Sequence, residues 1–373
     1  MPESKSIQDL IPFRIKVEPR LEETTWWQSL GITLIALVIA LLLGAVVLAM
    51  VGGDPWRAYA HIAKASFGDI GVFSDTMVKA IPLILVGLAS TVAFRMKLWN
   101  IGAEGQFFLG AFGASMVVLL PVLPEDSPRW LFILVMMLFG IVMGALWGFI
   151  PAYLKVKFNV NEVISTLMMN YIAVKWNDFF IYAVWSEGGF QMSKMFPKNA
   201  WLPRLTDYGK IIPELRGLTT HFGLVFALIA VVIVWFILYR SKWGYEIRLI
   251  GDNPKAANYA GIQLKKNIIG VMMLSGGLAG LAGMSEITGV VHRLQGAISP
   301  GYGFTGIIVA WLAKLNPYLV VIVSILFGAL ILAGREIQPS GVPKLIQGII
   351  LVCLIASDYL VRNRVRIVNK AKE

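Results

Sequence analysis

The chain has 373 residues, of which 57% are hydrophobic and only 15% are charged. Because soluble domains carry about 25% charged residues, this composition excludes an ordinary soluble domain and indicates lipid as the solvent. The formal net charge is +11, but the basic residues lie between and after apolar runs, as orientation signals do. They form no basic soluble domain, so we expect no binding to nucleic acid.

Ten apolar runs predict an all-α, polytopic membrane protein with about ten transmembrane helices. The run at 163–185 is only moderately apolar, and the run at 302–315 is short and interrupted by glycines. In chain order, the predicted spans are 31–51, 77–94, 101–121, 130–153, 163–185, 221–240, 267–289, 302–315, 318–334 and 343–361.

The distribution of Lys and Arg predicts the orientation of these spans. Ten spans put both termini on one side, and the basic residues favour the cytoplasmic side. The first thirty residues mix charges and precede a full-length span, so we expect no cleavable signal peptide. We therefore expect a multi-pass protein of the cytoplasmic membrane, with a cytoplasmic segment over 1–30, a transmembrane domain over 31–361 and a basic cytoplasmic tail over 362–373.

Three segments outside the spans have distinct compositions. Residues 55–67 follow a Gly-Gly-Asp turn and predict a short external helix on the membrane surface. Residues 186–220 form a long external loop, and residues 240–266 form the longest cytoplasmic connection, which is dense in charge.

Within that cytoplasmic connection, local signals predict one short helix. Pro254 suits its first turn, Asp252 or Asn253 suits its cap, and Gly261 suits its end. A helix alone in such a loop needs a surface to bury against, which indicates a soluble partner subunit on the cytoplasmic side.

A polar stripe follows one side of the span at 163–185. At about 100° per residue, its members fall within about 80° of one another; they are Glu162, Thr166, Asn170 and Asn177. They could join this helix to its neighbours by hydrogen bonds. The cost of ionisable groups inside a membrane favours instead the wall of a hydrated pathway.

The segment LWNIGAEGQF, residues 98–107, places a carboxylate between glycines at the start of an apolar run. One interpretation pairs Glu104 with Arg95 or Lys97 and uses the glycines for close helix packing. The other makes Asn100–Gly105 irregular, so that the helix starts at the glycines and directs its N-terminus toward a cavity. The sequence leaves both interpretations open.

Two further segments are rich in glycine. Four glycines in the span at 267–289 predict a helix face thin enough for close contact; they are Gly276, Gly277, Gly280 and Gly283. The segment SPGYGF at 299–304 predicts a re-entrant or broken helix. Glycine-interrupted regions in both halves of a transporter indicate a binding site between them.

Several catalytic motifs are missing from the sequence. There is no G-x-x-x-x-G-K-[ST] phosphate loop, no G-x-S-x-G and no H-E-x-x-H. The single cysteine, Cys353, excludes a disulfide within the chain, and the three histidines are scattered. We expect no catalytic residue, no metal site and no cofactor bound by this chain. Energy for transport would come from an ion gradient or from a partner, and Glu104, Glu162 and Asp178 lie too near span ends for a proton relay.

Three strings carry a resemblance to a known family. The strings at 96–114, 161–173 and 299–317 resemble permease subunits of nucleoside-type ABC importers, within the set of simple-sugar and branched-chain amino acid permeases. The string RLIGDNPKAANYAGI at 248–262 is similar to the cytoplasmic coupling segment of that set. The similarity runs in the same order over roughly residues 30–360.

The resemblance implies an ABC importer permease fold and specific partners. These are a second homologous permease, a tandem ABC ATPase that uses ATP and Mg, and an extracytoplasmic solute-binding lipoprotein. The implied coupling segment contacts the ATPase, with Arg248 and Asp252 as its main polar contacts. Its residues are Arg248, Gly251, Asp252, Asn253, Ala256, Ala257 and Gly261.

The function expected from residues and resemblance together is that of a permease subunit for nucleosides or related ribose-containing solutes. The polar stripe supplies Glu162, Thr166 and Asn170 to the pathway. Opposite them we expect a second group, namely Asn100, Glu104 and Gln106. The alternatives are a permease for another simple sugar or for branched-chain amino acids, and an ion-coupled secondary transporter that acts alone.

Overall fold

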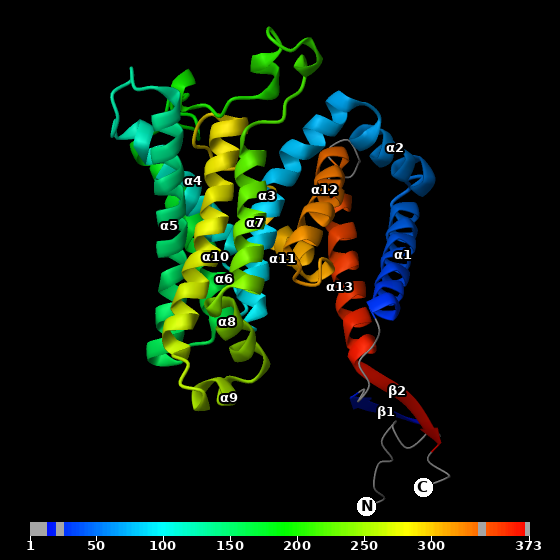
Figure 1. Ribbon diagram of the computed structural model, residues 1–373. Helices are drawn as coiled ribbons and strands as arrows, with labels where there is room; N and C mark the ends of the chain where they lie inside the picture. Colours follow the sequence, from blue (N-terminus) through cyan, green and yellow to red (C-terminus); the bar gives the residue numbers. More distant parts are fainter. Residues whose placement is uncertain (1–12, 20–25, 335–340, 370–373) are drawn as a thin grey trace, which may run out of the picture. The chain divides into compact units, whose positions relative to one another are not determined.

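The structure is a computed structural model that describes residues 13–19, 26–334 and 341–369 (Figure 1). The chain forms two compact units. One contains Met1–Arg57 and Gly341–Glu373, and the other contains Ala58–Ser340. Parts of the predicted terminal segments, namely 1–12, 20–25 and 370–373, lie outside the described residues.

The first unit combines two helices with a small sheet. Helices α1 (Trp26–Met50) and α13 (Val342–Arg362) pack against each other. Strands β1 (Phe13–Pro19) and β2 (Asn363–Asn369) are antiparallel, with Phe13 opposite Asn369. The all-α prediction missed this sheet. Apolar residues alternate with polar ones in FRIKVEP and in the RVRI part of NRVRIVN, and that period of two is the signal that could have found it.

The second unit is a helix bundle with α10 in its interior. Helix α10 contacts α3, α4 and α5, and α3 in turn contacts α7, α11 and α12. The bundle helices are α3 (Ile70–Arg95), α4 (Ala103–Leu119), α5 (Arg129–Phe158), α6 (Glu162–Phe179), α7 (Gly223–Arg240), α10 (Leu264–Glu286), α11 (Tyr302–Leu312) and α12 (Pro317–Ala333). Five-residue π-helical turns extend α6 at Phe180–Val184 and α10 at Ile287–Val291.

A helix occupies each of the ten predicted spans, and helix α2 (Pro55–Phe67) occupies the predicted surface helix. Within the described residues, five helices are long and apolar enough to cross a membrane, or six if α1 and α2 count as one broken span. Three apolar helices are shorter, namely α4, α11 and α12. Helices α4 and α11 are short because the chain before each one is irregular.

Glycines allow α10 to lie directly against its neighbours. A Cβ atom on Gly280 would overlap the carbonyl oxygen of Gly140, and one on Gly276 would overlap the carbonyl oxygen of Gly144. On the α4 side, a Cβ atom on Gly283 would overlap the carbonyl oxygen of Phe107. The prediction that these glycines let neighbouring helices pack closely against the backbone of α10 is therefore confirmed.

The two long connections of the second unit lie at opposite ends of its bundle (Figure 1). Helices α8 (Lys242–Asp252) and α9 (Pro254–Tyr259) lie at one end. The connection over 186–222 lies at the other end and contains isolated β-bridges and three short 3-10 turns, at Lys198–Ala200, Leu205–Tyr208 and Pro213–Leu215.

Candidate functional site

The N-termini of two helices meet inside the bundle. Helix α4 begins at Ala103 after an irregular segment, and α11 begins after Gly301, whose φ is +105°. In the first turn of α4, a carboxylate oxygen of Glu104 accepts a hydrogen bond of 2.6 Å from the backbone N–H of Gly303. The two glycine-interrupted regions of the sequence are thus in contact. The chain is irregular up to Gly102, as the second interpretation expects, but Ala103–Gly105 are helical. The glycines also serve close packing, as the first interpretation expects, since a Cβ atom on Gly110 would overlap Gly280.

The opposite end of α11 fixes the depth of this meeting point. The Trp311 ring lies 6.0 Å from the Phe94 ring, and an Arg95 guanidinium nitrogen donates to the Leu315 carbonyl at 3.3 Å. That end of α11 is therefore level with the end of α3. Eleven helical residues rise about 16 Å at about 1.5 Å each, which is roughly half of a hydrocarbon core about 30 Å thick. Glu104 and Gly303 consequently meet roughly half a hydrocarbon thickness from that end of the bundle.

Two helix N-termini compensate the buried charge of Glu104. The residue is only 6% exposed. It lies in the first turn of its own helix and accepts from the first turn of another, and both turns carry the positive end of a helix dipole. A Cβ atom on Gly303 would overlap the backbone of Glu104. The glycine therefore permits the close approach that this hydrogen bond requires.

A buried network of side-chain amides and hydroxyls holds the irregular segment, residues 96–102, in place. The Asn100 side-chain amide donates to the Gln106 side-chain oxygen Oε1 at 3.0 Å and to the Ser275 hydroxyl at 2.9 Å. The Ser275 hydroxyl in turn donates to the Ala89 carbonyl at 2.8 Å. Segment 96–102 is therefore bonded to α4 and α10, and Ser275 of α10 links it to α3. Its buried Asn100 side chain thus finds partners within the protein.

The polar stripe of α6 faces the same irregular segment. The Thr166 hydroxyl accepts from the Ile101 N–H at 3.2 Å. The Asn170 side chain accepts from the Gly105 N–H and donates to the Ile101 carbonyl, both at 2.8 Å.

Of the six predicted pathway residues, five lie in this network. They are Asn100, Glu104, Gln106, Thr166 and Asn170, and all five are buried. The sixth, Glu162, forms an ion pair of 2.6 Å with Lys155 instead. These contacts are those expected from hydrogen bonds between neighbouring elements, and a role in solute passage stays a prediction.

The predicted short helix of the cytoplasmic connection is confirmed as α9. Its cap is Asn253, whose side-chain oxygen accepts from the N–H groups of Lys255 and Ala256, both at 3.1 Å. Gly261 follows the helix with a φ of +76°.

Two expectations about this segment were wrong. Helix α8 precedes α9, so Gly251 and Asp252 belong to a separate helix, in which a Cβ atom on Gly251 would overlap the Arg95 carbonyl. Helix α9 also has partners within the chain: Ala257 is fully buried, and α9 contacts α8 and α10.

The exposed side of α8 and α9 carries a different set of residues. Tyr259 is 91% exposed, and Asp252 is exposed at the end of α8. The Arg248 guanidinium, by contrast, lies over the Tyr239 ring at 5.8 Å.

At the other end of the bundle, the long connection is anchored around a histidine. The Trp201 ring stacks on the His292 ring with centroids 3.8 Å apart. The Arg204 guanidinium donates to the Gly289 carbonyl at 2.9 Å and lies 3.0 Å from His292 Nε2. Burial, with the positive Arg204 adding to it, lowers the pKa of His292 to about 4.

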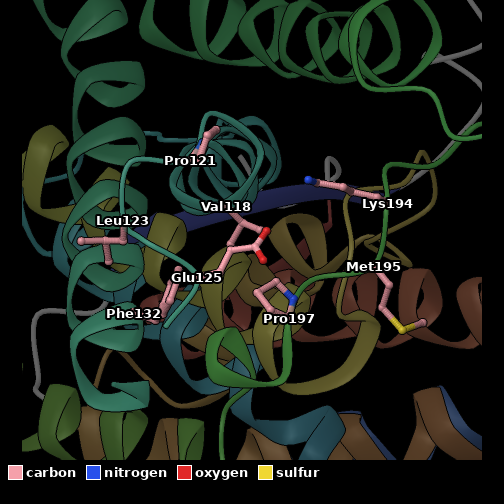
Figure 2. Close-up of a pocket in the computed structure, with 8 residues that line it drawn as sticks. All are labelled: Val118, Pro121, Leu123, Glu125, Phe132, Lys194, Met195 and Pro197. Atoms are coloured by element: carbon pink, nitrogen blue, oxygen red, sulfur yellow. The ribbon is translucent and has the colours of Figure 1, made fainter. Parts of the chain in front are cut away.

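A cavity of about 290 Å³ opens beside this connection (Figure 2). Figure 2 shows Glu125 and Lys194 on different segments around it, together with Phe132 and Met195. Because it lies at the end of α4 distant from Glu104, this cavity is separate from the meeting point of the two helix N-termini. Among the described residues, no group of three or more His, Cys, Asp or Glu side chains could hold a metal ion.

Residues 72–355 match the family described as branched-chain amino acid transport system / permease component. The chain belongs to this family. It is therefore a multi-pass membrane protein and the permease component of an ABC transporter, and the prediction that it is not the ATPase is confirmed.

Among curated relatives of this permease, the guanosine ABC transporter permease protein NupP of Bacillus subtilis is 35% identical over 341 residues, which cover 89% of this chain and 94% of NupP. The glucose ABC transporter permease protein TsgB13 of Haloferax volcanii is 31% identical over 95% of this chain and 94% of its own. A second guanosine permease protein of the same Bacillus strain, NupQ, is 28% identical over 65% of this chain and 75% of its own.

Proposed function

We propose that this permease carries nucleosides or related ribose-containing solutes into the cell as part of an ATP-driven importer. The observation that carries the proposal is the 35% identity to the guanosine permease NupP over nearly the whole of both chains. The meeting of two helix N-termini inside the bundle supports it, because transporters bind solute where broken helices end.

The motor of this importer is a separate ATPase that binds ATP and Mg, since the chain has no phosphate loop. We infer that a tandem ATPase docks on α8 and α9 and contacts Asp252, Asn253 and Tyr259. Gly251 and Ala257 then serve the packing of this segment on the bundle, because both are buried.

The remaining subunits follow from the same proposal. An extracytoplasmic lipoprotein delivers solute to the face that carries residues 186–220, and both chain termini lie in the cytoplasm. A second homologous permease completes the transporter, and similarity to both NupP and NupQ of one organism supports such a pair.

The polar network takes a supporting role in this proposal. Asn100, Gln106, Thr166 and Asn170 hold the irregular segment, and Glu104 joins the starts of α4 and α11. The network thereby fixes both half-helices beside the passing solute. Glu162 holds the start of α6 against α5 through its ion pair with Lys155.

An uptake assay tests the proposed solute. Cells without other nucleoside uptake, expressing the complete transporter, are given labelled guanosine with an excess of an unlabelled competitor. Nucleosides are expected to suppress uptake, whereas glucose, ribose and leucine are not. Transport of glucose with no response to nucleosides would contradict the proposal and favour a sugar permease, the candidate supported by the 31% identity to TsgB13.

A second assay tests the energy source. The purified chain is placed in liposomes without an ATPase and given a proton or sodium gradient. No accumulation of guanosine is expected, and accumulation would show an ion-coupled secondary transporter.

A further inference from the structure

One face of α6 is exposed and differs from the other exposed helix faces of the bundle. Most of its exposed residues recur at intervals of three and four and form one stripe on the side opposite Thr166 and Asn170, and two further exposed residues, Ile172 and Trp176, flank it. The stripe consists of Ile164, Met168, Tyr171, Lys175, Phe179 and Tyr182. On α7, the corresponding exposed residues are all apolar, as a lipid-facing helix requires; they are Val225, Leu228, Ile229, Val232, Ile233 and Phe236.

The stripe carries an exposed ion pair on the half of α6 that lies nearer the connection over 186–222. The Lys175 ammonium lies 3.0 Å from the Asp178 carboxylate, and the Lys175 side chain is 80% exposed. Lys175 lies about 20 Å along α6 from Glu162, and Tyr171, which is 65% exposed, lies about 14 Å along it, near the middle of a bilayer. Charged groups at such depth face protein or water, because lipid solvates them poorly.

Irregular backbone lies directly beside this ion pair. The Asn177 side chain donates to the Gln295 carbonyl at 3.1 Å, and a Cβ atom on Gly296 would lie 3.8 Å from the Asp178 carboxylate. From here the chain runs through Ala297 and Pro300, both exposed, to the start of α11. Non-helical backbone at membrane depth occurs only where protein buries it or where it lines water.

We propose that the exposed stripe of α6 and the neighbouring residues 296–300 line a water-filled solute pathway, and that Tyr171 and Lys175 contact the solute. Two independent observations, the exposed ion pair and the exposed irregular backbone, favour water over lipid on this face. The identity of the solute rests on the proposed function: the Tyr171 ring would stack on a nucleobase, and the Lys175–Asp178 pair would hydrogen-bond ribose hydroxyls.

The proposal also reassigns the pathway side of α6. Thr166 and Asn170 direct their hydrogen bonds into their own subunit, so the solute would meet the opposite side of the helix.

Single-cysteine labelling of the complete transporter tests the proposal. The native thiol is removed by Cys353→Ser, and Tyr171→Cys and Lys175→Cys are compared with Leu138→Cys and Val142→Cys on the apolar exposed face of α5. A charged, membrane-impermeant methanethiosulfonate is expected to modify positions 171 and 175 at least 10-fold faster than positions 138 and 142. Rates at 171 and 175 as slow as on α5 would overturn the proposal, whether lipid or a second permease covers the face.

Solute protection separates this proposal from the proposed function. Saturating guanosine is expected to slow modification at position 171 at least 5-fold. Fast modification that glucose slows and guanosine does not would retain the water-lined face but overturn the nucleoside assignment. Fast modification that no transported solute slows would overturn the solute contact at Tyr171.

A transport measurement tests Lys175 separately. Lys175→Met is expected to lower guanosine uptake about 10-fold with an unchanged amount of folded complex, and Lys175→Arg is expected to restore most of it. Leu138→Met is the matched control on the apolar face of α5. Full uptake by Lys175→Met would show that the ion pair has no part in transport.

Discussion

Glu104 and Gly303 are 199 positions apart, and the carboxylate of one accepts a 2.6 Å hydrogen bond from the backbone N–H of the other. This bond joins the first turns of α4 and α11. It also explains why an apolar chain tolerates a carboxylate at this depth: two helix N-termini compensate the charge.

We predict that Glu104→Leu destabilises the bundle by about 2–3 kcal/mol, because the Gly303 N–H would remain buried without its acceptor. Glu104→Gln keeps an acceptor and loses only the charge, so we expect about half of that loss. Thermal unfolding of the purified protein in detergent measures both variants. Equal stability of wild type and Glu104→Leu would show that the bond does not hold α11 in place.

The glycine contacts of α10 give a prediction with an internal control. Gly280→Ala forces a methyl group into the Gly140 carbonyl, so we expect a loss of about 1–3 kcal/mol and a lower yield of folded protein. In Gly348→Ala, the new methyl group meets nothing within 4 Å. That variant is expected to be neutral or slightly stabilising. Size-exclusion profiles and unfolding temperatures compare the two, and equal losses would contradict the close-packing interpretation.

The sequence predicted those elements whose signals are local. Apolar runs marked the positions of ten helices, and Pro254 with Asn253 marked the start of α9. Helix α8 was not predicted, because its charged residues obscured the helical spacing of its buried residues, which include Gly244, Ile247 and Gly251.

Contacts between distant segments could not be derived in the same way. Nothing near Glu104 in the sequence indicates Gly303 as its partner, and the polar stripe of α6 suits a protein interior as well as a pathway. Only the fold shows that Thr166 and Asn170 face the segment before α4. It also shows that Lys175 lies on the exposed side of the same helix.

A buried ion pair between α3 and α10 gives a third prediction. The Lys79 ammonium lies 3.4 Å from the Glu286 carboxylate, and their side chains are 7% and 4% exposed. Lys79→Met leaves the carboxylate without its cation, so we expect a loss of about 3–5 kcal/mol. The double variant Lys79→Met with Glu286→Gln removes both charges and is expected to recover at least half. A double variant no more stable than Lys79→Met would mean that the two charges do not compensate each other.

The anchored histidine gives a prediction for pH. Because the pKa of His292 is lowered from 6.5 to about 4, its neutral form favours the anchored connection at pH above 6.5. As pH falls from 6.5 to 4, His292 takes up its proton first in the state where the connection is released from the bundle. The anchored state therefore loses stability on the order of 2–3 kcal/mol relative to the released state. The backbone N–H of Phe196, which donates to the His292 carbonyl at 2.8 Å, reports the release by hydrogen exchange corrected for the intrinsic rate.

Two controls accompany this measurement. His292→Gln keeps an acceptor for Arg204 without a titrating group, so its exchange is expected to vary less between pH 6.5 and pH 4. The Ser127 N–H donates to the Pro124 carbonyl in another segment at the same end of the bundle and is expected to show no such change. Identical pH profiles for wild type and His292→Gln would exclude His292 as the titrating group.

The coupling segment gives the last prediction, which rests on the proposed ATPase partner. Tyr259→Ala and Asp252→Ala remove exposed side chains, so we expect normal insertion and folding but at least a 5-fold lower ratio of guanosine moved to ATP hydrolysed. Arg248→Ala is expected to lower stability as well, because the guanidinium packs over the Tyr239 ring. Asp126→Ala, an exposed aspartate at the opposite end of the bundle, serves as the control. The ratio is measured in proteoliposomes that contain the complete transporter, and unchanged coupling in both Tyr259→Ala and Asp252→Ala would place the ATPase contact elsewhere.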